Sequence, residues 1–178
     1  AVLAFSMLLP LGFDLVTGQR PPGYFFNAIA TTAGASVILL IVGFRRIRPS
    51  LSQREGSLVV VLIWLGACLF GALPLYFSGH FDRFVDAFFE SASGFTTTGA
   101  TVLDVIEMLP PELQLWRALS HWLGGMGIVL LSIAILPLIV QGGHDLYRAE
   151  FSGARSEQLK TRVIEASRTL WKIYLALT

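Results

Sequence analysis

Charged residues are scarce in this sequence, making up only 14% of its 178 residues. A soluble domain of ordinary composition carries about 25%. Apolar residues make up 54% of the chain, and they fall in long blocks instead of following one amphipathic period. This composition excludes an ordinary soluble domain and places the chain among membrane proteins.

Cysteine and histidine are scarce as well. The only cysteine, Cys68, lies within an apolar block, so an intrachain disulfide framework is excluded and we expect a small core residue. Two of the three histidines, His80 and His144, fall in connections predicted on opposite sides of a membrane, which argues against a three-histidine metal site. The sequence also lacks a glycine-rich phosphate-binding loop. We therefore expect no bound cofactor.

Four apolar blocks are candidates for membrane-spanning helices, and a fifth begins near the end of the chain. They cover residues 1–16, 24–44, 57–77 and 113–140, and the fifth starts at residue 170. A helix of about 20 residues rises about 30 Å, the thickness of the hydrocarbon core. Pro10 and Asp14 interrupt the first block. Because the chain has no initiator methionine and stops inside the last block, we expect it to be a fragment of a longer polypeptide.

Basic residues are concentrated in two connections, 45–56 and 141–168, which the positive-inside rule places in the cytoplasm. The segment between them must then enter the membrane from the outside. Its acidic residues outnumber the basic ones, and we expect them to form a vestibule that raises the local concentration of cations. These acids are Asp82, Asp86, Glu90, Asp104, Glu107 and Glu112.

The stretch 90–101, ESASGFTTTGAT, is a polar loop with glycines between two long apolar blocks. Irregular backbone at membrane depth must be buried in protein or line a water-filled path. We expect a short helix over residues 82–93 to precede the loop, with phenylalanines on its apolar side and Gly94 as the residue that ends it. The plainer interpretation of residues 93–101 is a polar surface turn between two helices.

The threonines of this loop carry the sharper prediction. Thr96, Thr97 and Thr98 are β-branched and favour an extended strand, which we expect to point its carbonyls one way. Gly99 has no side chain and can adopt a positive φ. Residues 96–99 therefore predict a cation selectivity filter built from backbone carbonyls.

Glu90 lies one turn before the predicted filter, where a bare carboxylate at membrane depth is costly. Arg117, near the outer end of the fourth span, is the expected partner. With that partner Glu90 would brace the filter from behind; the alternative is a solvated vestibule acid. Trp116 is expected to be an interfacial anchor. The stretch 124–127, GGMG, indicates either close helix packing or a gating hinge.

Two motifs carry a resemblance to a known family. SGFTTTGAT at 93–101 follows the predicted short helix, and WRALSHWLGGMGI at 116–128 precedes ILP at 135–137. In this order and separation they resemble the Trk/Ktr/HKT superfamily of potassium transporters, and within it the bacterial TrkH/TrkG branch. The resemblance covers nearly the whole chain, including two spans that this branch carries ahead of the shared core.

The resemblance implies an all-α, polytopic membrane protein of potassium-channel-like architecture, in which four linked span–loop–span repeats build one pore. This chain would hold an N-terminal helix pair (1–44), a cytoplasmic basic linker (45–56), the first repeat with its re-entrant pore helix and filter loop (57–140), a second cytoplasmic linker (141–168) and the start of the second repeat (169–178). Thr96, Thr97, Thr98 and Gly99 would supply a quarter of the filter, supported by Glu90, Arg117 and Gly94. Serine at the position of Gly99 goes with sodium preference in plant relatives, so glycine points to potassium.

By the same resemblance, the expected function is K+ uptake across the bacterial inner membrane by the pore-forming subunit of a Trk-type system. The resemblance also implies a cytoplasmic nucleotide-binding regulatory subunit of the TrkA kind and a homodimer of full-length chains in the bilayer. No enzymatic activity and no nucleic-acid partner are expected.

Three other interpretations stay open. One is a secondary transporter of another cation or solute with a broken-helix binding site. Another is a non-conducting structural subunit. The third is an intramembrane enzyme that uses Ser120 or His121, although adjacent helical residues face about 100° apart and cannot pair directly as nucleophile and base.

Overall fold

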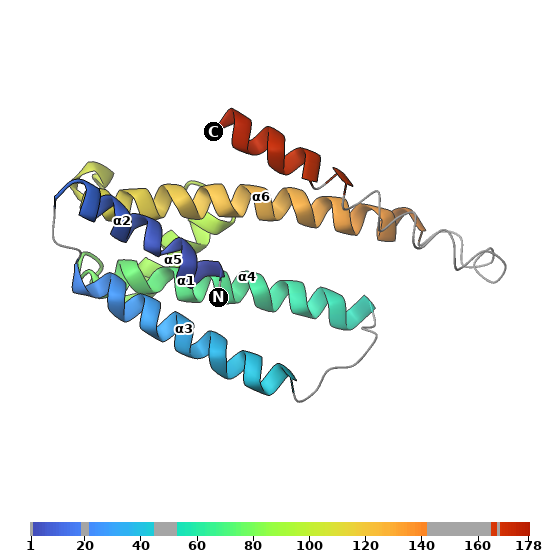
Figure 1. The fold of residues 1–178 in the computed structure, drawn as a ribbon, viewed down its shortest axis with the longest axis horizontal. Helices are drawn as coiled ribbons and strands as arrows, with labels where there is room; N and C mark the ends of the chain where they lie inside the picture. The colour runs from blue at the N-terminus through green and yellow to red at the C-terminus, as the bar shows by residue number, and fades with distance from the viewer. Residues whose placement is uncertain (1, 19–21, 45–52, 142–164, 167) are drawn as a thin grey trace. The chain divides into compact units, whose positions relative to one another are not determined.

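The computed structural model describes residues 2–18, 22–44, 53–141, 165–166 and 168–178. These residues fall into two compact units, Ala1–Trp122 and Leu123–Thr178. Within the described ranges the regular elements are helices, which confirms the predicted all-α class (Figure 1). In chain order they are α1 (Val2–Ser6), α2 (Leu8–Val16), α3 (Gly23–Phe44), α4 (Gln53–Phe77), α5 (Phe84–Phe95), the short 3-10 helix η1 (Ile106–Met108) and α6 (Pro111–Gln141).

The first apolar block folds as two helices, α1 and α2, instead of the single span predicted over residues 1–16. They meet at Met7, which is fully buried. Pro10 explains the break, because it has no N–H to donate to the carbonyl of Ser6 and its ring would clash there. Pro10 itself lies in the first turn of α2, a position that proline tolerates.

Two described helices, Gly23–Gly43 within α3 and Glu55–Phe77 within α4, are long and apolar enough to cross a membrane. Only 17% and 28% of their most apolar windows are buried within the chain, so most of their apolar surface faces outward. The prediction of four spans is therefore met at two of them. The predicted fourth block lies within α6, whose side chains from residue 130 onward are outside the described part.

The basic linker predicted over residues 45–56 is shorter than expected. α4 begins at Gln53, four residues before the predicted start of its span at residue 57, and Glu55 lies in its first turn. An acidic side chain there interacts favourably with the helix dipole. Residues 45–52 lie outside the described part of the chain.

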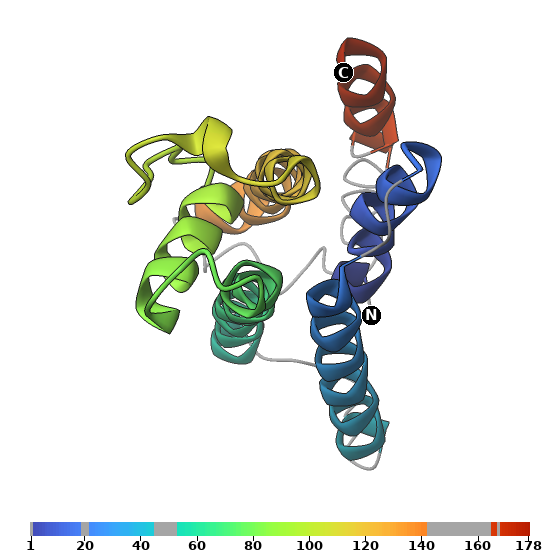
Figure 2. The same ribbon diagram turned by 90° about the vertical axis from the view of Figure 1, so that its left-hand side faces the viewer.

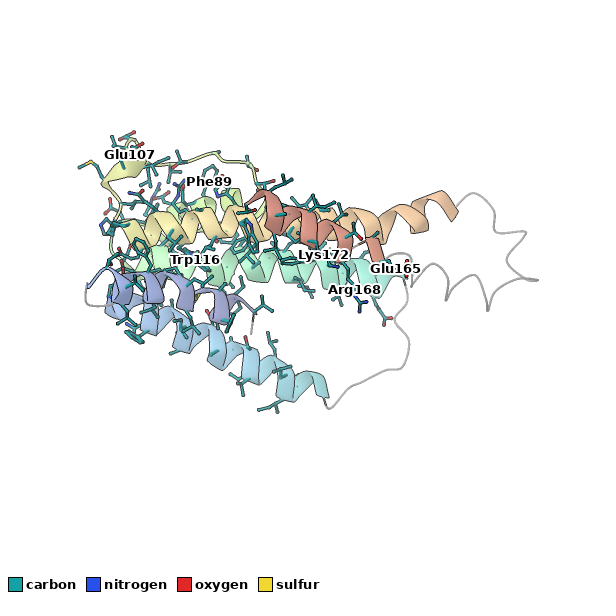
Figure 3. The ribbon with its side chains drawn as sticks, turned by 45° about the horizontal axis from the view of Figure 1, so that its top comes forward. Phe89, Glu107, Trp116, Glu165, Arg168 and Lys172 are labelled. Carbon is teal, nitrogen blue, oxygen red and sulfur yellow. The ribbon has the colours of Figure 1, made fainter. Side chains whose placement is uncertain are left out.

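The core of the first unit forms where α5 packs against α4 and α3 packs against α4 (Figure 2). Trp116 from α6 lies at its centre, only 1% exposed (Figure 3). Its indole N–H donates to the carbonyl of Gly71 on α4 at 2.9 Å, and its ring meets Phe95 edge-on at 6.5 Å. The prediction of an interfacial anchor was wrong for Trp116, because its N–H satisfies a helix carbonyl inside the protein instead of headgroups.

The second unit contains the rest of α6 and a C-terminal helical segment over residues 168–177, on which Figure 3 labels Arg168 and Lys172. This confirms the helix expected to start at residue 170, though not that it spans a membrane. The predicted second linker falls mostly on residues 142–164, outside the described part. In the stretch 124–127, Gly124 and Met126 are buried. This burial is compatible with both predicted roles, close helix packing and a gating hinge.

Candidate functional site

The C-terminal end of α5 positions the threonine-rich loop. The N–H of Thr97 donates to the carbonyl of Gly94 at 2.9 Å, and the N–H of Thr98 donates to that of Ser93 at 2.9 Å. This pair of bonds is the Schellman closure of a helix, whose C′ residue takes a left-handed conformation. Here that residue is Thr97, with φ of 57°. A β-branched residue rarely adopts this conformation, which costs of order 1–3 kcal/mol, so the closure holds Thr97 under strain.

Gly94 does not end α5 as predicted. The helix continues through Gly94 and Phe95 and is capped at Thr96. Gly94 instead allows α5 to approach α6 closely, because a Cβ added to it would collide with the hydroxyl of Ser120 and lie 3.0 Å from the Ser120 Cβ. Its absence of a side chain therefore serves packing directly behind the loop.

The loop backbone is not the extended strand that was predicted. Thr96 has φ of −82° and ψ of 0°, a helical value of φ, whereas φ is positive at Thr97 and at Gly99, where it is 75°. Thr98 is not among the described residues with positive φ. The sign of φ is therefore negative at Thr96, positive at Thr97, negative at Thr98 and positive at Gly99. The prediction of extended backbone was wrong because the helix closure bends Thr96 and Thr97. The predicted positive φ at Gly99 is confirmed.

The directions of the loop carbonyls follow from the directions of its N–H groups. Besides the bonds of Thr97 and Thr98, the N–H of Gly99 also donates to the Ser93 carbonyl, at 3.5 Å. All three N–H groups thus point toward the end of α5. In a planar trans peptide each carbonyl opposes the N–H of the following residue. The carbonyls of Thr96, Thr97 and Thr98 therefore point away from α5, toward one side of the loop.

Ser93 fixes both ends of this arrangement. Its carbonyl accepts the N–H groups of Thr98 and Gly99, and its hydroxyl donates to the carbonyl of Ala100 at 2.6 Å. Ala100 therefore turns its carbonyl back toward α5, which ends the outward-facing series. The hydroxyls of Thr96 and Thr98 lie 2.8 Å apart, and Thr97 donates to the Thr96 carbonyl at 2.7 Å.

Glu90 is buried, only 2% exposed, and both of its carboxylate oxygens have partners. Arg117 forms an ion pair with it, and the Arg117 Nε donates to Glu90 Oε1 at 2.7 Å. The Thr101 hydroxyl and the Val102 N–H donate to Oε2 at 3.0 and 3.2 Å. The predicted partner of Glu90 is confirmed. Since the carboxylate holds both α6 and the segment after the loop, a solvated vestibule acid is excluded.

The acidic vestibule carries less free charge than predicted. Of the six acids, Glu90 and Glu112 are buried, and Asp86 forms an ion pair with Arg83 at 3.0 Å. The hydrogen bonds to Asp86 raise the pKa of Arg83 above its ordinary value. Exposed acids remain at residues 82, 104 and 107, the last labelled in Figure 3 on the segment before α6.

The buried face of α5 also differs from the prediction. The phenylalanines of this segment, Phe84, Phe88, Phe89 and Phe95, were expected to be buried. Phe95 is buried, whereas Phe84 and Phe88 are half-buried and Phe89 is 44% exposed in this chain. The buried face consists of small and polar residues, namely Ala87, Glu90, Ser91, Ser93 and Gly94. Sequence reasoning missed the role of Ser93. Its spacing of three residues from Glu90 places both on one helix face, which was the available signal.

Ser120 and His121 are not arranged as a nucleophile and base. The Ser120 hydroxyl donates to the carbonyl of Arg117 at 2.6 Å, and the His121 Nδ1 lies 2.9 Å from the same carbonyl. Within the described residues no group of three or more His, Cys, Asp or Glu side chains could hold a metal ion. The geometry thus gives the enzyme hypothesis no support.

A family model described as "TrkH: Cation transport protein" matches residues 28–178. The chain belongs to the TrkH family. TrkH, the Trk system potassium uptake protein of Salmonella typhimurium, is 46% identical over 181 residues, which cover 99% of this chain and 37% of that protein. Its counterpart in Halomonas elongata is 38% identical over 179 residues, with the same coverage of 99% and 37%.

The fold agrees with this membership. The crystal structure of the potassium transporter TrkH from Vibrio parahaemolyticus is similar with a TM-score of 0.78 and 32% identity, covering 99% of this chain and 34% of that one. The chain thus spans little more than a third, 34–37%, of the length of these three relatives. TrkH-family proteins are integral to the membrane, which accounts for the outward apolar surfaces of α3 and α4.

Proposed function

We propose that the full-length protein takes up K+ across the bacterial inner membrane as the pore-forming subunit of a Trk-type system. In this proposal α5 is a re-entrant pore helix, and residues 96–99 supply one quarter of a filter of backbone carbonyls. K+ is the transported substrate. The membrane potential would contribute about 2.3 kcal/mol per charge per 100 mV to uptake.

One observation carries this proposal: the N–H groups of Thr97, Thr98 and Gly99 all face α5. Within the described residues the opposed carbonyls have no helical partner, although the Thr97 hydroxyl donates to that of Thr96, and they lie on one side, where they can act as ligands of a dehydrated cation. The Thr96–Thr98 side chains and Gly99 are exposed in this chain, so the loop is open to counterparts from elsewhere in the polypeptide. The partial negative charge at the C-terminal end of α5 also favours a cation there.

Glu90 and Arg117 are proposed to support the filter. The carboxylate joins α5, the segment after the loop and α6 through one buried group. Because a buried charge with complete hydrogen bonding resists displacement, it would keep the loop at a fixed distance from α6. Gly94 is proposed to support it by permitting the contact with Ser120.

The remaining parts of the proposal extend beyond this chain. We infer the repeat organisation set out above, with residues 57–140 as the first of four repeats. We also infer a cytoplasmic nucleotide-binding regulatory subunit of the TrkA kind and a homodimer of full-length chains. The names of the relatives, potassium uptake proteins of a Trk system, support a multi-component potassium system.

The test is K+-limited growth and Rb+ uptake in a potassium-uptake-deficient bacterium that expresses the full-length protein or its Gly99→Ser variant. Gly79 offers a matched control, because it also has positive φ, at 74°, and likewise has no atom within 4 Å of an added Cβ. Gly79→Ser imposes the same backbone strain outside the proposed filter. We expect rescue by the parent and by Gly79→Ser, and lost or Na+-shifted uptake in Gly99→Ser.

Two results would contradict the proposal. Equal rescue by the parent and Gly99→Ser would show that Gly99 is not part of the filter. A parent that reaches the membrane together with its regulatory partner, yet restores neither growth nor Rb+ uptake, would count against potassium as the substrate.

A further inference from the structure

Asp14, near the end of α2, is a buried acid without a partner. It is only 1% exposed, and neither of its carboxylate oxygens has a hydrogen-bond partner among the described residues. In the part of the chain that the structure describes, the other buried acids, Glu90 and Glu112, both have partners. An ionised carboxylate without a partner in an apolar environment is strongly disfavoured, so an ionisable residue of this kind points to a function.

A second buried acid lies near Asp14. Glu112, at the start of α6, is 7% exposed and accepts a hydrogen bond from the Tyr24 hydroxyl of α3 at 2.5 Å. Asp14 lies within electrostatic range of both Glu112 and Tyr24. From α3 the nearby titratable group is thus Tyr24, and from α6 it is Glu112. The helix α1, which packs against α2, carries none. Arg20 lies outside the described residues.

Two negative carboxylates in one buried site repel each other, and binding one proton relieves both the repulsion and the burial of charge. The hydrogen bonding decides where that proton resides. Glu112 already accepts the hydroxyl hydrogen of Tyr24. Asp14 receives none, and a protonated carboxyl can donate where an ionised one can only accept.

We propose that Asp14 of α2 is a proton-binding site, with the hydrogen-bonded pair of Tyr24 and Glu112, from α3 and α6, as its nearby titratable groups. A proton needs one oxygen, whereas oxygen-ligated metal ions take about six or more ligands. The side chains described near this site offer three free carboxylate oxygens, two from Asp14 and one from Glu112. The Tyr24 hydroxyl already donates to the other oxygen of Glu112. The site therefore suits a proton better than a metal cation.

The proposed site is connected to the loop through α6. Glu112 lies at the start of this helix, and Arg117, five residues further on, holds Glu90. Loss of the proton at high external pH would leave two nearby negative charges and would push the start of α6 away from α2. We therefore expect uptake to fall as external pH rises. This consequence rests on the proposed function, whereas proton binding itself does not.

The first measurement is infrared titration of the purified full-length protein, which detects the carbonyl absorption of a protonated carboxyl. We expect a component of this absorption that is present at neutral pH, is lost on raising the pH, and is missing in Asp14→Asn. Asparagine is neutral and of nearly the same size, so this variant should fold. Asp86→Asn, which removes a half-buried acid of α5 that pairs with Arg83, should keep the absorption. Tyr24→Phe, which removes the donor to Glu112, should shift the pH at which half of the absorption is lost.

The second measurement is Rb+ uptake against external pH. We expect uptake by the parent to fall by at most about tenfold per pH unit, as for a single proton, and the Asp14→Asn profile to be flat. A parent that takes up no Rb+ at any pH contradicts the proposed function, while the infrared titration still decides this proposal.

Three infrared or stability results would overturn the proposal. One is an absorption that is identical in the parent and in Asp14→Asn, with no midpoint shift in Tyr24→Phe. Another is a parent without the absorption in which Arg20→Gln creates it, since Arg20 would then be the counter-ion of an ionised Asp14. In the last, the parent lacks the absorption, K+ or Na+ raises its melting temperature, and Asp14→Asn abolishes that rise. This result would identify a metal-cation site.

Discussion

The hydroxyl of Ser93 donates to the carbonyl of Ala100 at 2.6 Å, joining the last turn of α5 to the far side of the threonine-rich loop. This bond turns the Ala100 carbonyl away from the side that the preceding carbonyls face. Removing it should free the loop to exchange between backbone arrangements while leaving its residues unchanged.

We therefore predict that Ser93→Ala lowers the preference of Rb+ over Na+ uptake by about tenfold, the equivalent of roughly 1–1.5 kcal/mol for one hydrogen bond. Ser91→Ala is a matched control, because Ser91 lies on the same buried face and its hydroxyl has no partner within the described residues. The measurement is competitive uptake in cells with equal amounts of each variant in the membrane. A similar loss in both variants would show that the Ser93 hydroxyl acts through packing alone.

A second prediction concerns Glu90. Glu90→Gln leaves the Arg117 guanidinium, whose side chain is 13% exposed, without its anion. Breaking one partner of a buried ion pair costs about 3–5 kcal/mol, so the melting temperature of the purified protein should drop and Rb+ uptake should fall with it. Asp86→Asn removes an acid of the same helix from an exposed pair with Arg83, which is worth about 0–1 kcal/mol. Equal effects of the two changes would disprove the bracing role.

A third prediction tests the contact of α5 with α6. Gly94→Ala should destabilise the protein by about 1–3 kcal/mol, because the new Cβ collides with Ser120. Gly66→Ala in α4 is the control, since nothing lies within 4 Å of a Cβ at that position. Thermal unfolding in detergent measures both. Adding Ser120→Ala should recover part of the loss, and full additivity of the two changes would mean that the residues do not meet.

A fourth prediction concerns Trp116, buried between α6 and α4. Trp116→Phe keeps most of the ring but removes the donor to Gly71, and should cost about 1 kcal/mol. Trp116→Ala should cost about 3–5 kcal/mol through the cavity it leaves. Quenching of tryptophan fluorescence by a lipid-attached quencher provides a separate check. Strong quenching of Trp116 would place it at the membrane interface and contradict its burial.

The sequence predicted the helices α3, α4 and α5 because long apolar runs end at polar or glycine-rich segments. It also predicted the Glu90–Arg117 pair, since a deep carboxylate needs a cation. It failed at the end of α5, where Thr97 occupies the left-handed position against its own propensity and Gly94 is used for packing. Such a choice depends on the approach of α6, which no local pattern contains. The burial of Trp116 was missed for the same reason.

The loop bonds have short sequence separations: Thr97, Thr98, Gly99, Ala100, Thr101 and Val102 all bond to Glu90, Ser93 or Gly94. Closing such short segments costs little chain entropy, and contacts of this kind form early in folding. The loop can thus acquire its shape locally, before the rest of the chain is synthesised. In the proposed four-repeat pore, a ring of such loops would then assemble from segments that are already folded, so its symmetry would not depend on the order of their synthesis.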